Sequence, residues 1–184
     1  MGRMAKVTIT GVQNVSNNIK RLFDDLRKDP AMLLDIGNKT VELTKAFNRA
    51  GSSPAANLGA KKHPKNSQAW EDRKAALTKT NKPSEFYKKG LSNVTFTGDL
   101  LESIEVKKIN VSDGSVEIEA TGQHAPYKNL HGQVSGKAVS NSDLVKYLKD
   151  KGRFIFGVNQ QITNNINKIV RQYLNKRIKQ LNVK

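Results

Sequence analysis

The chain has 184 residues, and its 32 lysines and arginines against 16 aspartates and glutamates give a formal net charge of +16. It contains no cysteine, which excludes a disulfide framework and a zinc–thiolate site and fits a reducing cytoplasm. No stretch approaches the roughly 18 apolar residues of a membrane-spanning helix, so we expect no membrane contact. The length suits a single domain over residues 1–184. The cationic excess favours polyanionic partners, nucleic acid first.

The N-terminal part of the chain is predicted to be helical. A first helix from Ser16 to Lys28 has Ser16 as a good N-cap, and Pro30 then suits the first position of a second helix that runs to about Ala50. The preceding segment KVTITGV is predicted to be extended and is a candidate further strand. Apolar residues recur at helical spacing in both helices: Ile19, Leu22, Phe23 and Leu26, then Leu33, Ile36, Leu43 and Phe47.

The following stretch has a different composition. Residues 51–90 hold nine lysines and arginines, three acids and three prolines, with few aliphatic residues. We therefore predict an extended basic loop or arm at about 51–95, which orders only on assembly. A short helix in QAWEDRKAALTKT is expected to anchor the chain's single tryptophan, Trp70.

The clearest β signal lies in residues 94–121. A helical turn over Asp99–Ser103 leads into a strand with Ile104 and Val106, and an irregularity is expected before Ile109. After the SDG turn, apolar and acidic residues alternate on a return strand, which predicts a hairpin. The fold class is therefore α+β, a small antiparallel sheet packed against helices.

The C-terminal part is predicted to hold two further helices. The first runs from Asn141 to Asp150, with Ser142 or Asn141 as its cap. KGRFIFG is expected to be a brief extended segment. A long closing helix from about Val158 to Leu181 carries one apolar stripe: Ile162, Ile166, Ile169, Val170, Tyr173, Leu174, Ile178 and Leu181.

Two of the three histidines lie in TGQHAPYKNLHG. His124 and His131 are seven residues apart with no third ligand nearby, which disfavours a metal site. The sequence has no cysteine nucleophile and no Gly-x-Ser-x-Gly elbow, so we expect no enzymatic activity and no cofactor. A hydrolase that uses His124 or His131 is the least favoured of three hypotheses; the other two follow below. The favoured interpretation is a structural loop, in which Tyr127 packs over the sheet and a Gly–His pair makes a turn.

The charge is concentrated towards the C-terminus. Residues 151–184 contain eight lysines and arginines and no acid. Five of them are predicted to lie off the apolar stripe of the last helix, facing DNA or an acidic partner: Lys168, Arg171, Lys176, Arg177 and Lys179. No base-reading module is recognisable, so any DNA contact is expected to be to phosphate and without sequence preference.

The order of the predicted helices, hairpin and motifs along the chain resembles that in the tailed-phage virion-morphogenesis family. These are the tail-completion and neck proteins that join head to tail. Thr97, Gly98, Leu100, Ser103 and Ile104 match the family's T-G-x-L-x-x-S-I stretch. Tyr127, His131 and Gly132 match a second element loosely, and Arg153, Phe154 and Gly157 match an R-x-F-hydrophobic-G turn before a terminal helix. Trp70, Leu77 and Thr80 resemble a W-x-x-L-x-x-x-T stretch upstream.

The resemblance implies a structural virion protein that forms a ring, commonly a hexamer, in contact with other phage neck and tail proteins. It implies no chemistry. The residues that match its motifs are candidate subunit-interface or structural positions. The alternative interpretation is a non-specific nucleic-acid-binding protein that uses the basic C-terminal helix and loop.

Overall fold

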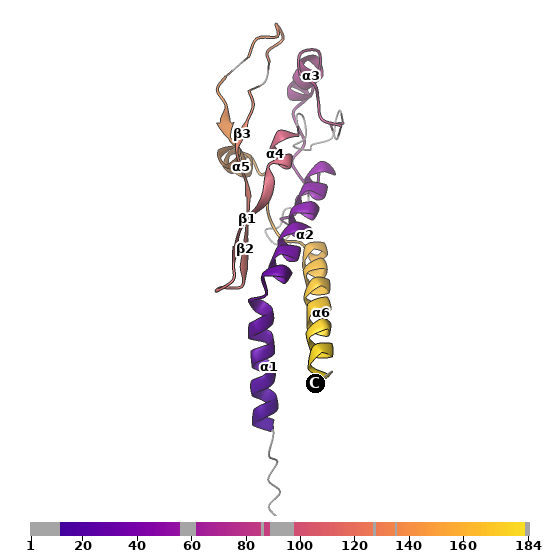
Figure 1. Ribbon diagram of the computed structural model, residues 1–184. Coiled ribbons are helices and arrows are strands. Elements are labelled where there is room, and N and C mark those ends of the chain that lie inside the picture. The colour runs from indigo at the N-terminus through magenta and orange to yellow at the C-terminus, as the bar shows by residue number, and fades with distance from the viewer. Residues whose placement is uncertain are drawn as a thin grey trace, which may run out of the picture.

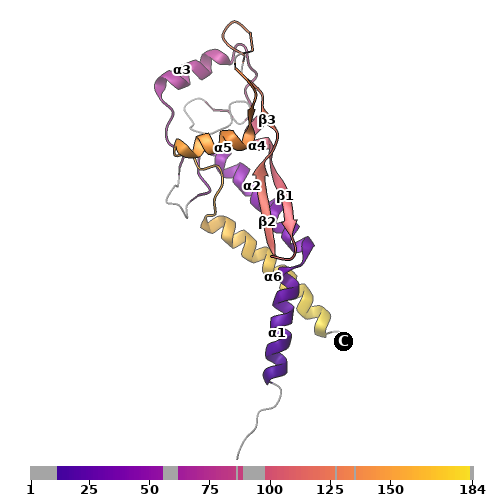
Figure 2. The same cartoon turned by 90° about the vertical axis from the view of Figure 1, so that its left-hand side faces the viewer.

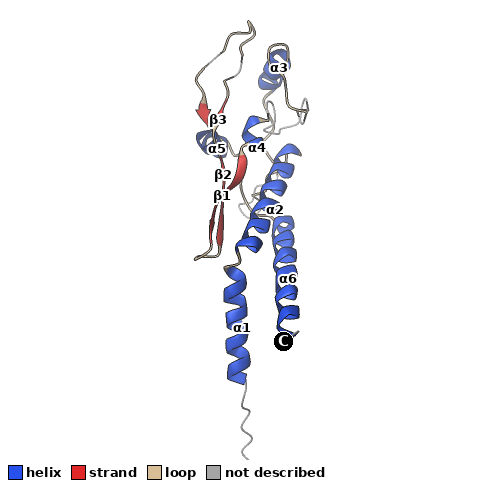
Figure 3. Ribbon diagram, in the orientation of Figure 1, coloured by secondary structure: helices blue, strands red, loops and turns tan. Residues whose placement is uncertain are grey.

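A computed structural model describes residues 12–55, 62–85, 87–88, 98–126, 128–134 and 136–182, without the side chains of 12–16 and 181–182. The described part is α+β, as predicted, with six helices and two small antiparallel strand pairs. The molecule is elongated: α1 (Val12–Arg27) forms one end, and α3 (Gln68–Leu77) and the loop between β3 and β4 form the other (Figures 1 and 3). Most of KVTITGV and all of Tyr127 lie outside the described residues, so their predictions stay untested.

The two N-terminal helices meet at a short junction. The carboxylate of Asp29 caps α2 (Pro30–Arg49), where its Oδ1 accepts from the backbone N–H groups of Ala31 at 3.0 Å and Met32 at 3.1 Å. Pro30 occupies the first turn, as predicted, because proline has no N–H to leave unsatisfied there. The first helix begins four residues before the predicted cap Ser16, so that cap assignment was wrong.

The predicted hairpin is confirmed. The helical turn α4 (Asp99–Glu102) leads into β1 (Ile104–Asn110), which pairs antiparallel with β2 (Ser115–Ala120). The register shifts between Val106 and Lys108, at the irregularity expected from the sequence. We call β1 and β2 together the ribbon.

The ribbon lies directly on α2 because the helix has a glycine at the contact. A Cβ added at Gly37 would lie 2.7 Å from a methyl carbon of Val106 and 2.9 Å from one of Val116. The inward face of the ribbon also contributes Ile104 and Ala120 to a core with Leu100, Leu101 and Ile155. Hydrophobic burial on α2 therefore stabilises a strand pair that would be marginal alone.

A second strand pair follows, which the sequence did not reveal. β3 (Gln123–His124) pairs with β4 (Val139–Ser140), and a bridge joins Lys128 to Val134 in the projecting loop between them. The next helix, α5 (Asn141–Asp150), has the predicted bounds. Its cap is Ser140 and not Asn141 or Ser142: the Ser140 hydroxyl accepts from the Asp143 N–H at 3.0 Å.

The long closing helix α6 (Gln160–Asn182) packs along α2. In the segment 151–157, which was expected to be extended, residues 151–152 form a turn and 155–156 a bend. α2 lies between the ribbon on one side and α6 on the other, as the two perpendicular views show (Figures 1 and 2). The two outer elements therefore turn their exposed surfaces in opposite directions.

Candidate functional site

The two histidines of the TGQHAPYKNLHG loop lie in ordinary turn and loop contacts in the described part of the chain. His124 is half-buried, and its Nδ1 donates to the carbonyl of Ala125 at 2.7 Å. His131 is exposed in a turn where the Asn129 side chain accepts from the His131 N–H at 2.9 Å, and Gly132 follows with φ +78°. Within the described ranges no group of three histidines and acids is placed to hold a metal ion. The predicted turn with a Gly–His pair is thus formed by His131 and Gly132.

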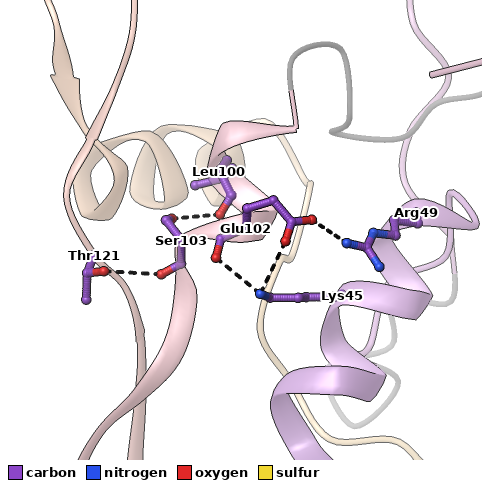
Figure 4. A network of polar contacts seen from close by, with 6 residues as sticks. All are labelled: Lys45, Arg49, Leu100, Glu102, Ser103 and Thr121. Carbon is purple, nitrogen blue, oxygen red and sulfur yellow. Dashed lines mark hydrogen bonds and ion pairs between the residues drawn. The ribbon is translucent and has the colours of Figure 1, made fainter. Parts of the chain in front are cut away.

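The segment that matches T-G-x-L-x-x-S-I connects the ribbon to α2. Gly98 begins α4 with φ +91°, a conformation that favours glycine, and Leu100 and Ile104 are buried in the core. The Ser103 hydroxyl donates to the Leu100 carbonyl at 2.8 Å, and the Thr121 hydroxyl donates to the Ser103 carbonyl (Figure 4). Thr97 lies outside the described residues, and the four other matched residues, Gly98, Leu100, Ser103 and Ile104, are buried or half-buried parts of the fold.

Glu102 makes the connection between this turn and α2. Its carboxylate pairs with Arg49 and, at 3.7 Å, with Lys45, whose ammonium also donates to the Glu102 carbonyl at 3.1 Å (Figure 4). The Glu102 side chain is 58% exposed, so each ion pair contributes little by itself. Their shared effect is to fix the turn on one face of α2.

The segment matched to R-x-F-hydrophobic-G is clamped by buried polar groups. Ser53 donates its hydroxyl proton to the Phe154 carbonyl at 3.0 Å. Asn48, fully buried on α2, donates to the carbonyls of Thr44 at 2.8 Å and Ile155 at 3.0 Å. A Cβ at Gly157 would lie 2.3 Å from Cα of Ala55, so only glycine allows this approach.

The histidine that sequence reasoning passed over, His63, is the buried one. Its Nε2 lies 2.8 Å from Oδ1 of Asn48. Because Nδ2 of Asn48 donates to two carbonyls, Oδ1 must accept, and His63 is therefore protonated at Nε2. Burial, and then the nearby Arg153 guanidinium, lower the pKa of His63 from 6.5 to about 4. The imidazole is neutral at pH 7.

A second buried chain of polar groups fixes α3. Arg153 donates to Asn66, Asn66 donates to Glu71, and Glu71 pairs with Lys74 at 2.8 Å. The Glu71 and Lys74 side chains are only 9% and 3% exposed, which is unusual for charged residues. Their spacing of three on a helix was the available sequence signal. By contrast, Trp70 is not a buried anchor: it is 38% exposed beneath the Arg73 guanidinium, 5.9 Å from the ring centre.

We expect stability to fall in mild acid because of His63. His63 takes up a proton near pH 6.5 in the unfolded chain but only near pH 4 in the folded chain. The neutral imidazole therefore contributes fully to the free energy of unfolding above pH 6.5. This contribution, up to about 3 kcal/mol, is lost as the pH falls from 6.5 to 4. His63→Gln keeps a donor for Asn48 and removes the titration. Urea unfolding at pH 7 and pH 4.5 should show a smaller loss for the variant. Equal losses for both proteins would contradict the assignment.

The five predicted basic residues of α6 divide into two groups. Arg177 follows Tyr173 by four residues and shares its face, where it pairs with Asp29 at 3.2 Å. The Tyr173 hydroxyl donates to Asp35 at 2.7 Å, and this hydrogen bond, more than burial, raises the pKa of Tyr173 to about 12. Arg177 was therefore wrongly placed off the apolar stripe. Lys168, Arg171, Lys176 and Lys179 are exposed, as predicted.

Large apolar side chains are exposed near both ends of the molecule. On α1, Ile19 and Phe23 are 49% and 53% exposed. In or beside the projecting loop, Leu130, Val134 and Val139 are 58%, 63% and 46% exposed. Leu34, Tyr147 and Ile178, on α2, α5 and α6, are exposed as well. Exposed apolar side chains that lie close together, as Ile19 and Phe23 do one helical turn apart, are typical of a surface that another protein covers.

Comparison with known proteins identified no relative. No protein-family model, no curated protein and no solved structure matches this chain. Among the helices in the described part of the chain, none combines the length and the apolar character that crossing a membrane requires.

Proposed function

We propose that this protein is a structural virion component of a tailed bacteriophage, which forms a ring at the head–tail junction as a neck, tail-completion or tail-terminator protein. It would assemble in the host cytoplasm, act within the virion, and contact other neck and tail proteins. The family resemblance suggests a homohexamer. No enzymatic role and no cofactor form part of the proposal.

The observation that carries this proposal is the exposure of apolar side chains at two separate ends of one elongated chain. Ile19 and Phe23 belong to α1, and Leu130 and Val134 belong to the loop between β3 and β4. These two elements lie at opposite ends of the molecule (Figure 1). Two different exposed surfaces favour head-to-tail contacts between copies, which form a ring when the rotation closes. The core position of Leu100 and Ile104 and the tight packing of Gly157 support a fold role for the family-like motifs.

The mass of the purified protein tests the proposal. Light scattering at several protein concentrations and two salt levels should give a closed oligomer near six subunits, and negative-stain images should show rings. Phe23→Ser and Leu130→Ser should each lower the mass, because each removes apolar area from one of the two surfaces. A strict monomer that shifts in mass only on addition of DNA would contradict the ring.

A second candidate function is non-specific nucleic-acid binding, which the outer face of α6 supports. Lys168, Arg171, Lys176 and Lys179 are exposed there, and the helix contains no carboxylate. If these four contact phosphates, the logarithm of the binding constant should fall against the logarithm of salt concentration with a slope of about −3 to −4. Replacing three of them with glutamine should reduce the slope to about −1 in fluorescence anisotropy with duplex DNA. An unchanged slope would remove α6 from the binding surface.

A further inference from the structure

Two surfaces on opposite sides of α2 differ in charge. Residues 99–120, which form α4 and the ribbon, carry six carboxylates against only two lysines, in a chain whose net charge is +16. Residues 151–184, which include α6, carry eight cations and no carboxylate. The ribbon and α6 lie on opposite sides of α2 (Figure 1).

The carboxylates of the ribbon point away from α2. Val106 and Val116 face Gly37 on the helix, so alternation along the strands turns Glu117 and Glu119 outward, and Glu105 with them. The register places Glu105 directly opposite Glu119, a like-charge pair that destabilises a strand pair.

Cations within the ribbon compensate this charge only in part. Lys107 is shared between Glu117, at 3.5 Å, and Glu119, and these two carboxylates raise the pKa of Lys107. The Glu117 and Glu119 side chains remain 49% and 32% exposed. The outward face of the ribbon can therefore accept a further cation.

The cations of α6 point away from α2 in the other direction. Tyr173 and Arg177 contact Asp35 and Asp29, which fixes the inner face of the helix. Lys168, Arg171 and Lys179 lie on the opposite face by helical spacing and are exposed. These three make no ion pair with any residue in the described ranges.

We infer that the outward face of α6 in one copy docks on the outward face of the ribbon in a second copy of this chain. The inference rests on the proposed ring and adds a pair of charged faces to the apolar ends that are proposed to contact there. Lys168 and Arg171 lie about 5 Å apart along the helix axis, and Glu117 and Glu119 lie about 7 Å apart along β2. Because the two faces differ and point in opposite directions, each copy binds one neighbour on each side.

A second copy explains more of these features than a nucleic acid does. Phosphates would neutralise α6 but would leave Glu105 opposite Glu119 without a second cation. A neighbouring copy brings Lys168, Arg171 and Lys179 to the ribbon carboxylates, which Lys107 compensates only in part. Opposite potentials also orient the subunits during association.

Charge reversal on either face tests the pairing. The first variant is Glu105→Lys with Glu117→Lys, and the second is Lys168→Glu with Arg171→Glu. Each alone should raise the apparent dissociation constant of the oligomer at least tenfold, because like charges then meet. Mixing the two variants in equal amounts should restore assembly, since every interface between unlike copies again joins opposite charges. Light scattering gives the mass in each case.

Matched controls carry the same charge changes on other surfaces. Asp72→Lys with Glu85→Lys controls the first variant, and Lys146→Glu with Lys149→Glu on α5 controls the second; all four residues are exposed. The control proteins should keep the wild-type mass, and thermal unfolding should show that all four variants are folded.

The outcomes separate this inference from the proposed function. An oligomeric wild type whose mass survives both reversals overturns the docking faces and leaves the ring intact. A wild type that stays monomeric at every concentration overturns both. If the α6 reversal abolishes DNA binding without changing the oligomer, nucleic acid is the partner of that face and the inference is wrong.

Discussion

Replacing Asn48 with alanine should lower the free energy of unfolding by about 3 to 4 kcal/mol. The side chain is fully buried and makes three hydrogen bonds, to the carbonyls of Thr44 and Ile155 and to the His63 imidazole. Truncation leaves the Nε2–H of His63 and the Ile155 carbonyl without partners in a buried place. Urea unfolding at pH 7, where His63 is neutral, measures the loss.

Asn38→Ala is the matched control, because Asn38 lies on the same helix and is exposed. Its effect should stay within about 0.5 kcal/mol. Similar losses for the two variants would show that helix propensity, and not the buried clamp, sets the result.

Gly157→Ala should also destabilise the protein strongly, by about 3 kcal/mol. The added Cβ would lie 2.3 Å from the Cα and 2.7 Å from the backbone nitrogen of Ala55. Backbone atoms cannot rotate away as a side chain can, so the turn before α6 and the segment at Ala55 must separate. The midpoint of thermal unfolding and the protection of α6 amides from hydrogen exchange should both fall.

Gly132→Ala separates crowding from backbone strain. A Cβ at Gly132 meets nothing within 4 Å, and the only cost comes from its φ of +78°, about 1 to 2 kcal/mol. The Gly157 variant should therefore be clearly less stable than the Gly132 variant. If the order is reversed, the close approach at Ala55 does not hold the fold.

Most regular elements could be predicted because their signals are local. The apolar spacing of Leu33 and Leu43 on α2, the stripe on α6 and the alternation in β2 each follow from one repeating pattern. Pro30 gave the start of the second helix correctly. Ser16 misplaced the start of the first, because a good capping residue can also lie within a helix whose neighbours continue the pattern.

The buried polar clamps could not be predicted because they join residues far apart in the chain. His63 lies among lysines and prolines, and nothing in KKHPK indicates that it meets Asn48, 15 residues earlier. The Arg153–Asn66 contact spans 87 residues. The short pair of β3 and β4 has two residues in each strand, too few for alternation to mark. The face of Arg177 could have been predicted, because it follows Tyr173 by four residues, but its partner Asp29 lies 148 residues away and could not.

The position of α2 between the ribbon and α6 has a mechanical consequence. Both outer elements are fixed to this one helix, the ribbon through Gly37 and the turn at Glu102, and α6 through Tyr173 and Arg177. A pull on the ribbon would therefore reach α6 chiefly as a tilt or sliding of α2. A subunit built in this way would pass tension across its width as the movement of a single rigid rod.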